Sequence, residues 1–318
     1  MRPQREFPDV QFCHATGTKA HTEGLDNFHN AFASIYEGRY LAGITAGMKL
    51  NEMIANGEIT EDQAKMGYVG AYTYAEVISG YTSFFLGARS VCPSVTMEVT
   101  FTGSWYDETA EKEGANKLID DGCVLISQHA DSMGAPTACE TAGVPNVSYN
   151  GSTESACPNT FLVSSRINWA PYFEYAMGCV ESGDAIDADW TGDLKTGSVE
   201  LTSLGKAVAE GTQEAIDEAA AKLEDGSLHV FDISTFTVDG KTLDSTWQTW
   251  IQMLIMKETM RQFLTDISMS PQRASVQLLI SMFRSMVLPF WIHSSDSAKT
   301  ERGGAALSQH RPFVRYNR

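Results

Sequence analysis

Between residues 66 and 166, segments with the apolar pattern of a strand alternate with segments with the apolar pattern of a helix. Short apolar or alternating runs of strand length lie at 66–72, 95–101, 123–129, 144–150 and 160–167. Between them, apolar residues recur at helical spacing over 75–90, 107–122 and 132–143. The strands begin near residues 66, 95, 123 and 145, and the spacings of 29, 28 and 22 residues are typical of βα units. This pattern predicts an α/β fold with a doubly wound parallel sheet and helices on both faces.

The flanking sequence predicts further elements. A strand that ends in a loop is predicted at 8–17, and one long helix at 25–54. A helix at 204–226 and a strand at 228–234 follow the alternating region. Because one strand and one helix cannot form a stable sheet, residues 1–58 need partners from elsewhere.

Charge divides the chain into two unlike parts. The 318 residues carry 23 basic and 40 acidic side chains, a net charge of −17. Residues 246–318 hold 9 basic and 4 acidic residues (+5), so residues 1–245 hold 14 and 36 (−22). Nucleic acids and anionic membranes repel so acidic a protein, and we expect no nucleic-acid partner.

Neither targeting segments nor cysteine motifs stand out. The N-terminus lacks the apolar run of a signal peptide, and no stretch of 18 apolar residues predicts a transmembrane helix. The six cysteines form no CxxC pair and no zinc-finger spacing with histidine. They are either buried thiols or partners in disulfides, with Cys139–Cys157 and Cys92–Cys123 as candidate pairs.

Aromatic and acidic residues follow the predicted strands. Ligands of an open parallel sheet bind beyond the carboxyl ends of its strands, so these loops form the candidate site. Trp105 and Trp169 offer flat faces for stacking on a planar ligand. Asp107 and Asp131 can accept hydrogen bonds from ring N–H or ribose hydroxyl groups. Alternatively, each aspartate only caps a helix, Trp169 belongs to a core, and His129 is structural.

Motifs of catalysis do not appear in the sequence. It has no GxGxxG, no GxSxG and no HExxH, and Gly240-Lys241-Thr242 lacks the first glycine of a P-loop. We therefore expect a binding protein, without a metal or cofactor, rather than an enzyme. An enzyme that processes nucleosides and a ligand-sensing or signalling module remain as alternatives.

Eight stretches, taken together, are similar to one known family. They are HATG (14–17), IYEGRYLAGITAG (35–47), GYVGAYTYAEVISGYTSFFLGARSV (67–91), SWYDETAEKEGANKLIDDG (104–122), ISQHADS (126–132), SYN (148–150), INWAPYFEYA (167–176) and AEGTQEAIDEA (209–219). In order and spacing they resemble the basic membrane lipoprotein family, the PnrA-like substrate-binding proteins of ABC transporters. The resemblance extends from Phe7 to Gly240.

This resemblance implies a periplasmic-binding-protein type I fold, in which two doubly wound lobes close on a ligand. It implies a protein without enzymatic activity that binds a purine nucleoside or nucleobase and delivers it to a membrane permease. The ligand-binding positions that it implies are Trp105, Asp107, Asp131, Asn150 and Trp169. It also implies a lipoprotein in the periplasm or anchored to the outside of the plasma membrane.

The resemblance further implies a division of the chain. Residues 1–58 match a remnant of the first lobe, a strand and a long helix, so the first lobe is expected to be incomplete. Residues 59–166 and 198–240 match the second lobe, and 167–197 match the hinge or crossing segment.

The tail, residues 245–318, resembles no part of the family. Its sequence is compatible with two amphipathic helices near 247–267 and 271–288, on a membrane or a partner. The alternative, which the abrupt change of composition favours, is a shifted reading frame.

Overall fold

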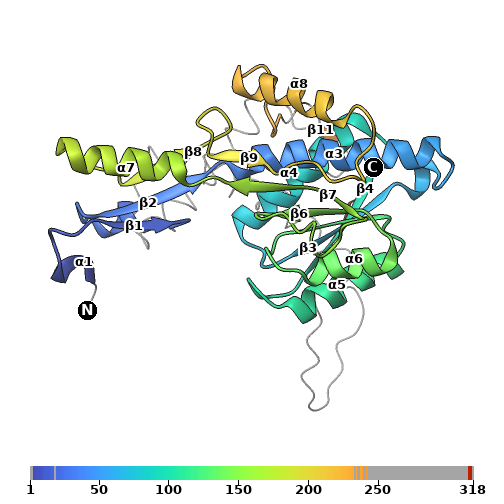
Figure 1. Ribbon diagram of the computed structural model, residues 1–318, viewed down its shortest axis with the longest axis horizontal. Coiled ribbons are helices and arrows are strands. Elements are labelled where there is room, and N and C mark those ends of the chain that lie inside the picture. Colours follow the sequence, from blue (N-terminus) through green and yellow to red (C-terminus); the bar gives the residue numbers. More distant parts are fainter. Residues whose placement is uncertain are drawn as a thin grey trace, which may run out of the picture.

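Two sheets of unequal size carry the fold (Figure 1), and two short strands outside them pair antiparallel. The computed structural model describes residues 3–17 and 19–232, Ser234, and the segments 237–238, 241–242 and 314–316. The helices are α1 (Pro3–Glu6), α2 (Ala20–Glu23), α3 (Ile35–Ala55), α4 (Ala75–Val91), α5 (Glu108–Asp120), α6 (Gly134–Ala142), α7 (Ala170–Ser182) and α8 (Thr212–Glu224), with a 3₁₀ turn η1 (Glu61–Gln63). The strands are β1 (Phe12–Ala15), β2 (Phe28–Ala33), β3 (Lys65–Gly70), β4 (Thr96–Phe101), β5 (Leu125–Gln128), β6 (Asn146–Tyr149), β7 (Phe161–Ile167), β8 (Asp189–Gly192), β9 (Val199–Leu201), β10 (Thr237–Val238), β11 (Lys241–Thr242) and β12 (Val314–Tyr316). The helices predicted in the tail lie outside the described residues.

The larger sheet has the strand order β12-β4-β3-β5-β6-β7-β9. Strands β3 to β7 run parallel, whereas β12 and β9 pair antiparallel with the strands beside them at the two edges. The five strands and three helices predicted between residues 66 and 166 are confirmed as β3 to β7 and α4 to α6. Chain order reverses at β3, because β4 lies on one side of it and β5 on the other.

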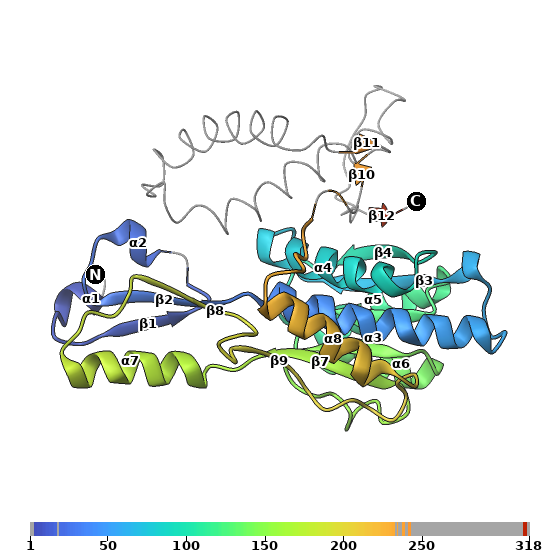
Figure 2. The same cartoon turned by 90° about the horizontal axis from the view of Figure 1, so that it is seen from above.

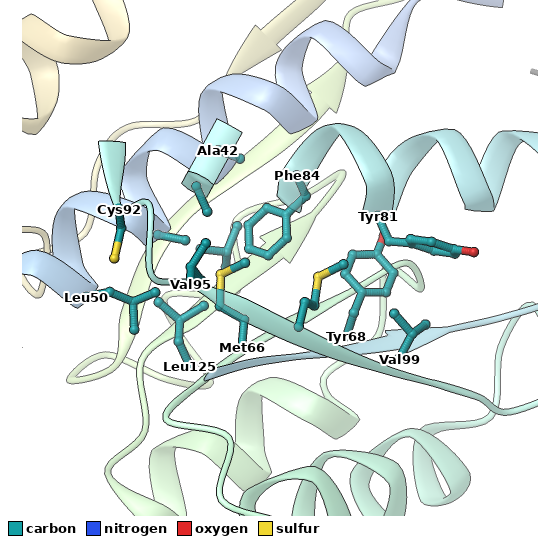
Figure 3. Packing of buried hydrophobic residues seen from close by; sticks show 14 of the residues in the cluster. Ala42, Leu50, Met66, Tyr68, Tyr81, Phe84, Cys92, Val95, Val99 and Leu125 are labelled. Carbon is teal, nitrogen blue, oxygen red and sulfur yellow. The ribbon is translucent and has the colours of Figure 1, made fainter. Parts of the chain in front are cut away.

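Helices cover both faces of this sheet (Figure 1). The core between α3, α4 and the sheet includes Ala42, Leu50, Met66, Tyr68 and Phe84, all buried (Figure 3). A smaller cluster around Leu118 and Ile126 joins α5 and α6 to the opposite face. Helix α8 packs on the outer side of α3, where Ile216 meets Ile44 in a third cluster. Among the described residues, no helix has the length and apolar content that crossing a membrane requires.

Glycines bring α3 and α4 unusually close together. A Cβ atom at Gly43 would collide with the carbonyl oxygen of Phe84, and one at Gly87 would collide with that of Tyr40. Glycine is the one residue that permits this approach, since any side chain would force the helices apart. The close contact fixes α3 against the larger sheet.

The smaller sheet has the order β1-β2-β8 with all strands parallel, and α7 lies alongside it (Figure 2). The prediction of one helix over 25–54 is wrong for residues 28–33, which form β2. Phe28 and Phe32 fit a helical repeat in sequence, but β2 is the middle strand and pairs with neighbours on both sides. Buried His29 contacts the Gln11 side chain and the Asp187 backbone, contacts that only the tertiary structure supplies.

The contacts differ from the predicted division of the chain at two points. The long helix, assigned to the remnant of the first lobe, packs as α3 on α4 and β7 of the larger sheet. The predicted hinge at 167–197 mostly forms β8, a strand of the smaller sheet, and α7, which lies alongside that sheet.

The strand predicted at 228–234 is wrong, because the described residues there form no strand. The helix predicted at 204–226 is confirmed as the shorter α8.

Three crossings join the two sheets side by side. The chain passes between them at Ser34, at Asn168, and over residues 193–198. The backbone N–H of Ser34 donates to Gly192 at 2.8 Å, and that of Asn168 donates to Ser198 at 2.8 Å. The third crossing is therefore hydrogen-bonded at or beside both of the others.

Candidate ligand-binding site

The carboxyl ends of the parallel strands meet at one edge of the larger sheet. Because chain order reverses at β3, the loops after β3 and β5 diverge there, and such switch points are where open α/β sheets bind ligands. The loop after β3 runs to Tyr74, the loop after β4 carries Trp105, and the loop after β5 begins at His129.

Five rings, four from these three loops and one from the end of β6, lie next to one another. Tyr72 and Tyr74 stack with ring centroids 5.2 Å apart. Trp105 lies 5.2 Å from Tyr72 and 5.7 Å from Tyr74, at tilted angles, and 6.0 Å from His129. His129 in turn stacks on Tyr149 at 4.8 Å. Trp105 is 48% exposed and Tyr74 is 52% exposed, so this aromatic group offers open ring faces to a planar ligand.

A carboxylate lies at the base of the aromatic group. Oε2 of Glu76, in the first turn of α4, is 3.4 Å from Nε2 of His129, and the Tyr149 hydroxyl donates to Oε1 at 3.4 Å. Burial raises the pKa of Glu76, but the hydrogen bonds from His129 and Tyr149 outweigh it and the pKa lies below the ordinary 4.5. Burial raises the pKa of Tyr149 well above its usual value, which keeps its hydroxyl a donor.

A buried cation supports these groups from below. Arg39 is fully buried and donates to the carbonyl of Ser148 at 3.1 Å and to the hydroxyl of Ser127 at 2.8 Å. Its guanidinium lies over three rings, those of Tyr68, Phe84 and Tyr149, at 5.1–5.6 Å from their centroids. Burial raises the pKa of Tyr68 to about 12, so this ring stays neutral beside the guanidinium.

The structure brings two of the predicted polar residues together and gives a third another task. Asn150 donates to Oδ2 of Asp131 at 3.3 Å, and both lie at the carboxyl edge. Asn150 has a φ of 65°, in the left-handed region that asparagine tolerates better than most residues. The carboxylate of Asp107 accepts from the backbone N–H of Ala110 at 2.9 Å and caps α5.

Trp169 lies in a different environment from Trp105. It precedes α7 and packs with Tyr172 and Trp190 in the core of the smaller sheet, and is partly buried. This matches the alternative that Trp169 is a core residue, at the margin of the junction between the sheets.

Sequence reasoning missed Glu76 and Arg39 as parts of this edge. Glu76 precedes the apolar positions of a helix and reads as an ordinary first-turn acid. The signal that identifies Glu76 is a carboxylate at the start of the helix that follows the strand where chain order reverses, and recognising it requires the sheet order. His129, expected to be structural, is indeed buried, yet it also joins the aromatic group.

Residues 3–228 match the family described as ABC transporter substrate-binding protein PnrA-like. The chain belongs to this family. The putative ABC transporter glucose-binding protein TsgA13 of Haloferax volcanii is 34% identical over 220 residues, 69% of this chain and 51% of the relative. A purine-binding protein of Brucella abortus is 31% identical over 232 residues, 73% of this chain and 61% of the relative. The chain thus spans less than two thirds of the length of each of these two relatives.

A solved structure shows the same fold. The solute-binding protein of an ABC transporter system from Aeropyrum pernix K1 superposes with a TM-score of 0.60 at 16% identity, over 80% of this chain and 77% of that chain. The periplasmic-binding-protein fold expected from the resemblance is therefore confirmed for this PnrA-like protein.

Proposed function

We propose that this protein is the substrate-binding component of an ABC importer and that its ligand is a purine nucleoside. The aromatic group at the switch point carries this proposal, because its exposed rings, Tyr74 and Trp105, suit the flat face of a purine. The purine-binding relative supports the same ligand class.

Polar residues around the rings would supply selectivity. Asp131 and Asn150 form a pair that can exchange hydrogen bonds with a base or sugar, and Asp107 and Trp169 complete the set implied by the family. The edge also carries negative charge at Glu76, Asp107 and Asp131. A neutral nucleoside suits this edge better than a nucleotide, since phosphate would be repelled.

The proposed mechanism is closure of the two sheets on the ligand, without chemistry. A ligand that contacts the carboxyl edges of both sheets stabilises the closed state, because it binds that state more tightly than the open one. The three crossings provide the place where the chain bends. The closed form would then be recognised by a membrane permease, at the periplasmic or outer face of the plasma membrane.

Calorimetric titration of the full chain tests this proposal, with guanosine, inosine, adenosine, guanosine monophosphate and glucose, each to millimolar concentration. We expect at least one nucleoside to bind at least about tenfold more tightly than the nucleotide and glucose. Glucose that binds more tightly than every nucleoside would overturn the assigned ligand class, and the glucose-binding relative makes it the relevant competitor.

A further inference from the structure

Glu76 stands at the centre of the candidate site but outside the set of positions that the family implies. It begins α4 directly after the loop that carries Tyr72 and Tyr74. Its side chain is 27% exposed, so it is partly open to solvent beside the aromatic group. Its two protein partners come from the carboxyl ends of β5 and β6, so residues from three separate segments of the chain position the carboxylate.

The contacts of Glu76 leave it with acceptor capacity on both oxygens. His129 approaches Oε2 and Tyr149 approaches Oε1, and each oxygen of a carboxylate accepts along two directions. Both contacts measure 3.4 Å, longer than the usual range of about 2.5–3.2 Å. The two protein donors therefore use one accepting direction on each oxygen, and a ligand that presents two neighbouring donors could use the other.

The proton positions fit this arrangement. A carboxylate only accepts, so the His129 contact is a hydrogen bond when Nε2 carries the proton. The Tyr149 hydroxyl is held in its donor form because its pKa lies well above the ordinary value. Both neighbours thus donate to Glu76, and neither competes with a ligand as an acceptor there.

We propose that Glu76 binds the vicinal hydroxyl pair of the ligand's sugar, one hydroxyl on each carboxylate oxygen. The inference rests on the proposed function and specifies it: the ligand is a ribonucleoside and not a deoxyribonucleoside. Trp105 lies 6.0 Å from His129, and His129 contacts Glu76, so the sugar of a nucleoside whose base stacks on Trp105 would be within reach of the His129–Glu76 pair. A hexose presents the same pair of hydroxyls, and the test separates the two sources.

The test compares the wild-type chain with Glu76→Gln in calorimetric titrations against guanosine and 2′-deoxyguanosine. Glutamine keeps the size of the side chain but loses the charge and one acceptor oxygen. We expect the wild type to bind guanosine about 10- to 100-fold more tightly than the deoxynucleoside, and Glu76→Gln to reduce this ratio to below about threefold. The control is Glu214→Gln, an exposed glutamate in the first turn of α8, which is expected to keep the wild-type ratio.

Each outcome decides a distinct question. If nucleosides bind but Glu76→Gln preserves the ratio, the role of Glu76 is wrong and the proposed function stands. If only glucose binds, the purine ligand is wrong. In that case, an affinity of Glu76→Gln for glucose about tenfold weaker than that of the wild type would support the hydroxyl contact, and an unchanged affinity would overturn it. If no probe binds, both proposals fail. A thermal melt checks that each variant is folded.

Discussion

The guanidinium of Arg39 donates to the carbonyl oxygen of Ser148 at 3.1 Å, across 109 residues of sequence. This contact ties α3 to β6 beneath the aromatic group. The cation is buried among rings and hydroxyls, with Tyr68, Phe84 and Tyr149 facing it. Arg39 therefore acts as a structural support of the candidate site.

Replacement of Arg39 should destabilise the fold. Arg39→Ala leaves the Ser148 carbonyl without this donor and opens a cavity between three rings, and we expect a loss of at least about 3 kcal/mol in the free energy of unfolding. Urea titration measures it. The control is Arg166→Ala, since Arg166 is 46% exposed and pairs with Glu200 at the surface, and its cost should stay below about 1 kcal/mol. Equal losses in both variants would contradict the role of Arg39.

Two glycines inside helices should respond in opposite directions to alanine. Gly43→Ala forces a methyl group against the Phe84 carbonyl and should cost about 1–3 kcal/mol. At Gly178 in α7, no atom lies within 4 Å of an added Cβ, so Gly178→Ala should stabilise by up to about 1 kcal/mol through helix propensity. Thermal unfolding compares the two. A stabilising Gly43→Ala would refute the close contact between α3 and α4.

The aromatic group should carry ligand affinity. Trp105→Ala removes the most central ring of the group and should weaken nucleoside binding by about 5- to 150-fold, the range expected for one base–aromatic stack. Phe173→Ala is the matched control, because Phe173 is 59% exposed on α7, away from the aromatic group. Calorimetry provides the measurement. Unchanged affinity in Trp105→Ala would remove the aromatic group from the site.

Substitutions at Asp107 separate helix capping from ligand binding. Asp107→Ala loses the hydrogen bond from Ala110 and should cost about 1 kcal/mol of stability, whereas Asp107→Asn should retain most of it because asparagine also caps helices. If Asp107 also contacts the ligand, Asp107→Asn weakens binding while stability stays near wild type. Denaturation and titration of both variants give the answer, and a destabilised Asp107→Asn would contradict simple capping.

Acid should reduce the contribution of Glu76 to stability. The folded-state pKa of Glu76 lies below the ordinary 4.5, so its ionised form is favoured by folding. This stabilisation is complete above the unfolded-state pKa and is lost as the pH falls through the folded-state value. The difference in unfolding free energy between wild type and Glu76→Gln should therefore shrink as pH is lowered from 6 toward 3. A difference that grows on acidification would mean that the pKa is raised.

The sequence predicted the larger sheet well because its signals are local. The runs that became β3 to β7 are apolar or alternating and are separated by helices with ordinary start and stop residues, so each element could be read without its neighbours. The strand β2 could not be predicted from local sequence signals. Phe28 and Phe32 suit either a helix or a strand, and the choice depends on pairing with β1 and β8, far apart in sequence.

The candidate site shows the same limit. Trp105, Asp131 and Asn150 were predicted at the carboxyl edge of the sheet because they lie in the segments that follow strands, and the structure places them at that edge. Glu76 escaped notice since its meaning depends on His129 and Tyr149, which only the sheet order brings to it. Trp169 follows a strand too, but its ring is held by the core of the smaller sheet, and proximity in sequence could not show that.

The three crossings between the sheets have a mechanical consequence. The three short links lie side by side: Ser34 bonds to Gly192, directly before the third link, and Asn168 bonds to Gly197 and Ser198 within it. Links arranged in this way oppose twisting and sliding far more than bending. The smaller sheet and α7 would then swing as one rigid arm with a single degree of freedom. A partner protein would then need to detect only the angle between the two sheets. Every ligand that closes the protein would change this angle by the same movement.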